Sequence, residues 1–201
     1  MGNNASVLLD YKKRGDMLIT RQKFGQSGFS LIELLVAVAV LGVLVSFALP
    51  SFRTWTINSQ IRNAAESVTN GLQRARSEAV SRNTNVAFSL TSPPDSSWSV
   101  YSITPASGID SRTFSEGSKA VSIAVTPLGS TTVTFNSFGG ALTTNPGTVV
   151  PVTGTAVPAA PFTAVDFTAP GGNKNLRVTV PLGGIARMCD PNAAAGSTTA
   201  C

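Results

Sequence analysis

The side chains that most often carry catalytic chemistry are scarce in this 201-residue sequence. It contains no histidine, which excludes a Ser-His-Asp or Cys-His arrangement. The acids in the C-terminal part show no recognisable pairing for general acid and base work. They are Asp95, Asp110, Glu116, Asp166 and Asp190. A phosphate-binding glycine loop of the usual form is also absent, so we expect no enzymatic activity and no cofactor.

The two cysteines, Cys189 and Cys201, both lie close to the C-terminal end of the sequence. In an oxidising compartment they can form a disulfide, and closing a loop of this size stabilises the folded chain by about 3 kcal/mol in chain-entropy models. Two free thiols are the alternative. A structural metal site is not expected, because two cysteines without histidine cannot complete a tetrahedral set of ligands.

Glu33 is the single charged residue in an apolar run over residues 29–50. A carboxylate at the edge of a membrane span is costly and commonly requires a partner of opposite charge. Alternatively, the side chain extends to the membrane surface without a specific partner.

This apolar run is long enough to cross a membrane as a helix. Its 21 residues from Phe29 to Leu49 give a helix about 31 Å long, close to the thickness of the hydrocarbon core. Five basic and two acidic residues precede the run, so the positive-inside tendency keeps residues 1–28 cytoplasmic and sends the rest of the chain across. Those 28 residues carry +3 of the net charge of +5, and the remaining +2 is weak support for a nucleic-acid partner.

The helix is expected to continue beyond the membrane, to near Arg82. Apolar residues recur there at steps of three and four, which predicts one buried stripe on a helix. The members of the stripe are Ile57, Ile61, Ala64, Ala65, Val68, Leu72, Ala75 and Ala79. Arg62, Glu66 and Arg74 fall off the stripe, and Arg76 and Arg82 are expected on a solvated face of the helix.

After Asn83 the apolar period shifts towards two, which predicts strands. The expected strands are Val86–Leu90, Trp98–Ile103, Val121–Val125, Thr132–Phe135, Phe162–Phe167 and Leu176–Val180. Residues 91–97, 138–140, 169–173 and 181–184 are expected turns, and 143–161 a long surface loop with at most a weak strand. The predicted fold is α+β: a long N-terminal helix, half transmembrane and half amphipathic, packed on an antiparallel β-sheet head.

The junction between leader and apolar run reads KFGQSG followed by FSLIE, and it resembles the cleavage site of type IV prepilins. The resemblance implies that prepilin peptidase cuts after Gly28 and methylates Phe29. Glu33 would then be the fifth mature residue and pair with the free amine of an adjacent subunit. Pro50 would kink the helix, or else break it at the membrane surface. The expected segments are residues 1–28 (cleaved leader), 29–50 (transmembrane half), 51–83 (amphipathic half) and 84–201 (head).

Three further segments narrow the resemblance: LQRARSEAVSRN (72–83), VTFNSFGGAL (133–142) and LRVTVPLGGIARMCDP (176–191). They are similar to the GspH/FimT family of minor pilins and pseudopilins. The resemblance implies a structural subunit in type IV pilus assembly, at initiation or at the tip, or alternatively a minor pseudopilin of type II secretion. It also implies a single pass through the bacterial inner membrane, a periplasmic head, and three kinds of partner: other pilin or pseudopilin subunits, prepilin peptidase and the inner-membrane assembly platform.

A third possibility is DNA binding, because some members of that family bind DNA during natural transformation through a Gly-Arg-x-Arg turn. The corresponding segment here is Gly184-Ile185-Ala186-Arg187, so Arg187 matches the second arginine and an isoleucine replaces the first. Lys174 and Arg177 lie nearby and can supply cationic contacts to phosphates. Arg187 can instead cap a turn or pair with Asp190, and the missing arginine favours the structural roles over a DNA receptor.

Overall fold

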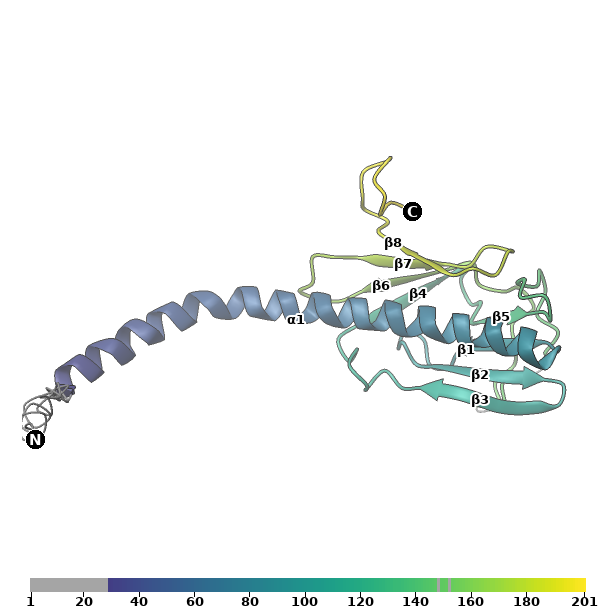
Figure 1. Ribbon diagram of the computed structural model, residues 1–201, viewed down its shortest axis with the longest axis horizontal. Helices are drawn as coiled ribbons and strands as arrows, with labels where there is room; N and C mark the ends of the chain where they lie inside the picture. The colour runs from purple at the N-terminus through teal and green to yellow at the C-terminus, as the bar shows by residue number, and fades with distance from the viewer. Residues whose placement is uncertain (1–28, 148, 152) are drawn as a thin grey trace, which may run out of the picture. The chain divides into compact units, whose positions relative to one another are not determined.

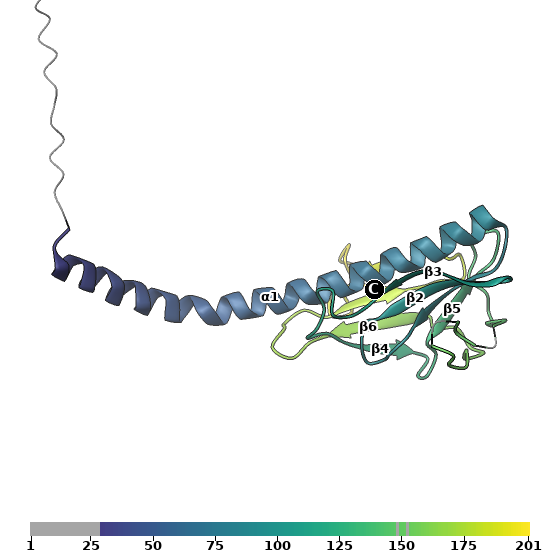
Figure 2. The same cartoon turned by 90° about the horizontal axis from the view of Figure 1, so that it is seen from below.

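The computed structural model describes residues 29–147, 149–151 and 153–201. The expected leader over residues 1–28, including Gly28, lies outside the described residues. The chain divides into two compact units, Met1–Leu44 and Val45–Cys201. The second unit contains the head, and Figures 1 and 2 show how its strands are arranged along α1.

Helix α1 runs from Leu31 to Arg82 and includes Pro50, so the alternative of a helix break at that proline is wrong. The helix ends where its chemistry predicts. Asn83 takes a left-handed conformation (φ 50°), as residues following a helix commonly do. The N–H of Thr84 donates to the carbonyl of Ala79, which satisfies one of the last carbonyls of the helix.

The predicted stripe on the second half of α1 is buried in the head, from Ile61 to Ala79. Arg62, Glu66 and Arg74 lie on the exposed side, as expected. Arg76 departs from the prediction, because it is half-buried and its Nε donates to the carbonyl of Gly139 (2.9 Å). Arg82 pairs with Glu78 on the helix surface (2.6 Å).

In the described part of the chain, eight strands form two four-stranded sheets, and every pairing between them is antiparallel, as predicted. Sheet A has the order β3-β2-β1-β5, with β1 Val86–Leu90, β2 Trp98–Ile103, β3 Ala106–Arg112 and β5 Thr132–Phe135. Sheet B has the order β4-β6-β7-β8, with β4 Ser122–Thr126, β6 Ala164–Thr168, β7 Leu176–Thr179 and β8 Arg187–Cys189.

One hydrophobic cluster joins α1 to both sheets. Figure 2 shows the second half of the helix lying along one side of them. Gly71 permits the close approach, because a Cβ there would lie 2.6 Å from the ring of Phe88 and 3.0 Å from that of Trp98. The indole N–H of Trp98 donates to the hydroxyl of Ser67 on the helix (2.9 Å, buried). Helix and sheet A are therefore joined by ring packing and by a hydrogen bond.

Two strands were not predicted, β3 and β8. Strand β3 is an exposed edge strand whose residues do not alternate between apolar and polar, so the sequence carries no period-two signal there. It forms because it continues a hairpin from β2, whose register fixes it. Strand β8 has only three residues and pairs with β7 alone.

The expected surface loop over residues 143–161 is partly wrong. Asn145 is buried, and its amide donates to the carbonyls of Thr132 and Pro158. Val150 is also buried, in a small second cluster with Ala87 and Tyr101 of sheet A. The segment therefore covers the face of sheet A that α1 leaves free, and its only pairing among the described residues is an isolated bridge between Val149 and Ala156.

Candidate functional site

The start of α1 is built from Ser30 and Glu33. The backbone N–H of Glu33 donates to the hydroxyl of Ser30 (3.2 Å), so Ser30 caps the helix and Glu33 occupies its third position. A serine followed three residues later by glutamate is the capping-box pattern. This signal was present in the sequence and our prediction missed it. The hydrogen bond itself uses the backbone N–H of Glu33. Its side chain, as an acid in the first turn, favours the start of the helix, besides the assembly role that we predict for it.

The first half of α1 exposes its apolar side chains on all sides. Every residue from Phe29 to Leu49 is exposed, and Phe29 itself shows 85% of its surface. By length and composition this stretch is the one candidate for a membrane span among the described residues. An apolar surface of this length is stable only when lipid or other protein covers it.

The structure explains why a glycine occupies the first position of the Gly184-Ile185-Ala186-Arg187 segment. Gly184 has a positive φ (75°), and a Cβ there would collide with the carbonyl oxygen of Gly139. Gly139 and Gly184 belong to the turns at residues 138–140 and 181–184. These two turns are further joined by the hydrogen bond from the N–H of Ala141 to the carbonyl of Leu182 (3.0 Å). Since Arg76 also bonds to Gly139, this glycine belongs to a contact that ties both turns to α1.

The three basic residues predicted for DNA contacts have different surroundings. Arg177 forms a two-pronged ion pair with Asp166 on the neighbouring strand (2.7 and 2.8 Å), and this carboxylate raises the pKa of the guanidinium. Lys174 is exposed in the loop before β7, and Arg187 is exposed on β8 opposite Thr179. Neither has an ion pair among the described residues, so the suggested pairing of Arg187 with Asp190 is not seen.

Arg177 and Arg187 are brought to the same face of sheet B, because Arg177 lies two residues before the partner of Arg187. The position of the missing arginine, Ile185, is exposed and apolar. With Arg177 neutralised by Asp166, this region offers few free cations for a phosphate backbone.

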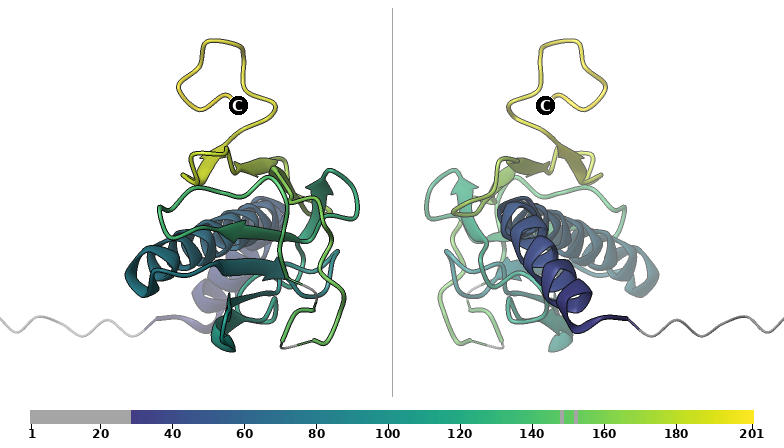
Figure 3. Two further views of the ribbon diagram at one scale, coloured as in Figure 1. Left: turned by 90° about the vertical axis from the view of Figure 1, so that its right-hand side faces the viewer. Right: turned by 90° about the vertical axis from the view of Figure 1, so that its left-hand side faces the viewer.

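Cys189 and Cys201 form a disulfide, with their Cα atoms 5.0 Å apart. The intervening loop projects from sheet B (Figure 3). None of its residues is buried, although the N–H of Asp190 donates to the carbonyl of Thr199 (2.7 Å). The bridge therefore fixes the shape of a surface loop and adds no side chain to the core.

The described residues contain no group of three or more acids, histidines and cysteines that could hold a metal ion. The five acids considered for catalysis are spread over the head. Asp166 and Glu116 form ion pairs with Arg177 and Arg112. The features that stand out are instead surfaces: the bare half of α1 and the joined turns at its far end.

Two family models match the sequence. The model described as type II transport protein GspH matches residues 64–184, and the model of the prokaryotic N-terminal methylation motif matches residues 23–49. Together they cover the leader junction, the two ends of the helix and most of the head.

Similar curated proteins include a fimbrial protein of Pseudomonas aeruginosa, 31% identical over 101 residues, which are 50% of this chain and 60% of that protein. The type IV major pilin protein PilE1 of Neisseria gonorrhoeae is 41% identical over 39 residues, 19% of this chain and 24% of that protein. The chain therefore matches less than two thirds of the length of these relatives.

Two solved structures that this chain resembles share little sequence with it. The type IV minor pilin FimU of Pseudomonas aeruginosa has 18% identity and a TM-score of 0.47, with 71% of this chain and 98% of that one covered. The minor pseudopilin EpsH from the type 2 secretion system of Vibrio cholerae has 14% identity and a TM-score of 0.47, with 67% and 99% covered.

Proposed function

The chain belongs to the GspH family, and we propose that it is a minor pilin, a structural subunit that acts in type IV pilus assembly at initiation or at the tip. Its similar curated proteins are fimbrial and pilin proteins, which supports a structural rather than an enzymatic role. Its partners would be other pilin or pseudopilin subunits.

The observation that carries this proposal is the contrast between the two halves of α1. The same helix is fully exposed from Leu31 to Leu49 and buried on one face from Ile61 to Ala79. The head therefore buries one face of the second half. The first half requires another cover, which lipid provides before assembly and the helices of neighbouring subunits provide afterwards.

The N-terminal methylation model over residues 23–49 supports the proposed processing. Prepilin peptidase would cut after Gly28 and methylate Phe29, which leaves Glu33 as the fifth residue. The mature subunit would then wait in the inner membrane with its head in the periplasm, until the assembly platform moves it into a filament. In the filament, the carboxylate of Glu33 would pair with the N-terminal amine of a neighbour.

Surface pili in a clean deletion strain test the proposal. We expect pili to be lost and to return when an intact copy of the gene is restored. Unchanged pilus numbers in the deletion strain would reject the role in pilus assembly.

A pseudopilin of type II secretion is the second candidate, and the description of the matching family model favours it. It requires the same helix and head, but its deletion leaves pili intact while secreted proteins accumulate in the periplasm. Measuring both pili and secretion in the same strains separates the two candidates. We do not propose DNA binding as a third candidate function, because Arg177 is paired with Asp166 and Ile185 replaces the first arginine of the turn.

A further inference from the structure

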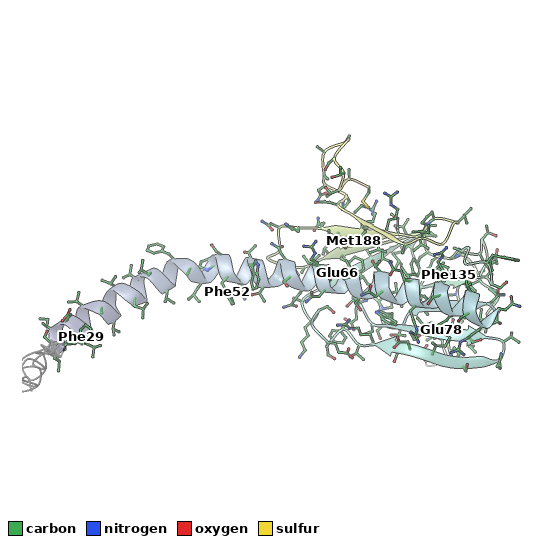
Figure 4. All side chains as sticks on the ribbon, viewed as in Figure 1. Phe29, Phe52, Glu66, Glu78, Phe135 and Met188 are labelled. Carbon is green, nitrogen blue, oxygen red and sulfur yellow. A yellow bond between two sulfur atoms is a disulfide. The ribbon has the colours of Figure 1, made fainter. Side chains whose placement is uncertain are left out.

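An open groove of about 1050 Å³ lies between α1 and the end of sheet B. One wall is formed by α1 residues between Pro50 and Arg62, and the other by residues 173–176, β8 and the disulfide loop. Met188, which is labelled in Figure 4, belongs to the second wall. The groove lies wholly within the unit Val45–Cys201.

The apolar part of the groove is formed by Trp55, Leu176 and Met188. Trp55 is 66% exposed, and its ring lies against that of Phe52, with centroids 5.8 Å apart. Two exposed aromatic rings in contact leave a large apolar surface in water. Tryptophan is enriched where a membrane meets water, because its ring is amphipathic.

Three charged residues line the groove, and their states differ. Arg62 is paired with Glu66 (3.1 Å), and the carboxylate of Asp190 accepts the N–H of Asn192 (2.8 Å). Lys174 is exposed and has no ion pair among the described residues. The groove thus combines an apolar wall with one ammonium group free to bind an anion.

The walls are held in place by bonds that do not depend on an occupant. Asn58 on the helix and Asn173 on the loop exchange two hydrogen bonds (2.7 and 3.1 Å) beside Lys174. A Cβ would lie 3.2 Å from Ile57 at Gly171 and 3.0 Å from Ile61 at Gly172, so the glycines let this loop approach the helix closely. The opposite side is fixed by the disulfide. The groove is therefore largely formed before anything binds, which lowers the cost of ordering it.

The position of the groove along the chain indicates its occupant. Its lining begins at Pro50 and Ser51, directly after the apolar run that ends at Leu49. If that run spans the membrane, as the proposed function requires, these residues emerge among the lipid headgroups. We propose that the groove binds the phosphate headgroup of a phospholipid of that membrane, with Lys174 on the phosphate and Trp55 at the level of the glycerol.

Fluorescence of the full chain reconstituted in vesicles tests the proposal. The vesicles contain phosphatidylcholine brominated near the glycerol, with or without phosphatidylglycerol. Trp55 is exposed, whereas Trp98 is buried and bonded to Ser67, so Trp55→Phe gives the signal of Trp98 alone. We expect the wild-type chain to be quenched, more strongly with phosphatidylglycerol present, and Trp55→Phe to show little quenching.

Lys174→Gln and Lys119→Gln form a matched pair. Lys119 is also exposed and without an ion pair among the described residues, but it does not line the groove. One lysine near an anionic surface changes binding about fivefold. We therefore expect Lys174→Gln to lower the occupancy of the groove by about that factor, and Lys119→Gln to leave it unchanged. Millimolar inorganic phosphate should not reverse the quenching, because the site takes its phosphate from the lipid.

Equal quenching of wild type and Trp55→Phe would overturn the proposal, and so would equal effects of the two lysine variants. Release by inorganic phosphate would also contradict it, by showing a site for free phosphate. Flotation of the same vesicles reports membrane insertion separately. A chain that floats with the vesicles without quenching of Trp55 rejects the headgroup site alone, whereas a chain that does not float rejects the membrane-anchored function beneath it.

Discussion

Glu33 carries the only charge of the apolar run, and its N–H donates to the capping hydroxyl of Ser30. Loss of function in a Glu33 variant therefore has two physical explanations: the lost charge or a weaker helix start. Glutamine keeps the pattern of a capping box but has no charge. Comparing the two substitutions distinguishes these roles.

We predict that Glu33→Val and Glu33→Gln are both processed normally and both fail to enter the filament, because neither can pair with an amine. Immunoblots of sheared surface pili and of membranes measure incorporation and cleavage. Normal incorporation of Glu33→Gln, with loss only in Glu33→Val, would assign the effect to capping of the helix.

Gly184 gives a second prediction for a single residue. Gly184→Ala introduces a side chain at a positive φ and against the carbonyl of Gly139. We expect it to lower the free energy of unfolding by about 2 to 4 kcal/mol. The neighbouring Gly183 faces open space without a positive φ, so Gly183→Ala should change it by less than about 0.5 kcal/mol. Urea unfolding of the full chain in detergent, followed by near-UV circular dichroism, measures the stability of both variants. Equal stabilities would contradict the close contact between the two joined turns.

Tyr101 makes the stability of the head depend on alkaline pH. Burial raises the pKa of its phenol to about 12, from the ordinary value of about 10. The folded state therefore keeps a proton that the unfolded chain loses, so this contribution is complete below pH 10 and disappears as the pH rises towards 12. The free energy of unfolding should fall by about 3 kcal/mol over that range from this residue alone.

Tyr101→Phe should remove that part of the pH dependence and leave the part due to other groups. Urea unfolding at several pH values, in the wild type and the variant, gives the difference. Parallel pH profiles would show that the phenol ionises equally in both states.

Among the elements, those predicted well are the ones whose pattern follows from burial. The second half of α1 has its stripe inside the head, as the spacing of Ile61, Leu72 and Ala79 requires. Strands β1, β2 and β5 lie within the predicted bounds, because β-branched and aromatic residues interleave there with Ser and Thr in short runs bounded by turn residues. The end of α1 was also predicted, since Asn83 stops it.

The elements that were missed depend on distant partners. Strand β3 is polar and exposed, and it exists because β2 offers a free edge. Asn145 looks like an ordinary loop residue in the sequence. In the structure it is buried, and its side chain is hydrogen-bonded to Thr134, Thr132 and Pro158. Arg76 reads as a surface residue and instead bonds a turn 63 residues further along the chain. Sequence periodicity contains no information about such long-range bonds.

The candidate site was predicted unevenly for the same reason. The apolar run and the cysteine pair are local or terminal features, and the structure shows an exposed helix and a disulfide there. The pairing of Arg177 with Asp166 could not be predicted, because it depends on the register of β6 against β7. The groove between α1 and sheet B could not be predicted either, since its walls lie more than 100 residues apart in sequence.

In the whole molecule, α1 begins with an exposed apolar segment, and its second half contributes to the hydrophobic core of the head. This arrangement suits a subunit that moves from lipid into a filament, because both surroundings cover the same side chains. The remaining polar surfaces, such as the disulfide loop and the joined turns, are then available for contacts with neighbours.

Mass spectrometry of sheared and purified surface pili tests the central claim most directly. The account predicts that this chain is present in the pili in small amounts, with methylated Phe29 as its first residue. Finding the chain only in the membrane fraction, with residues 1–28 still attached, would contradict both the processing and the assembly that we propose.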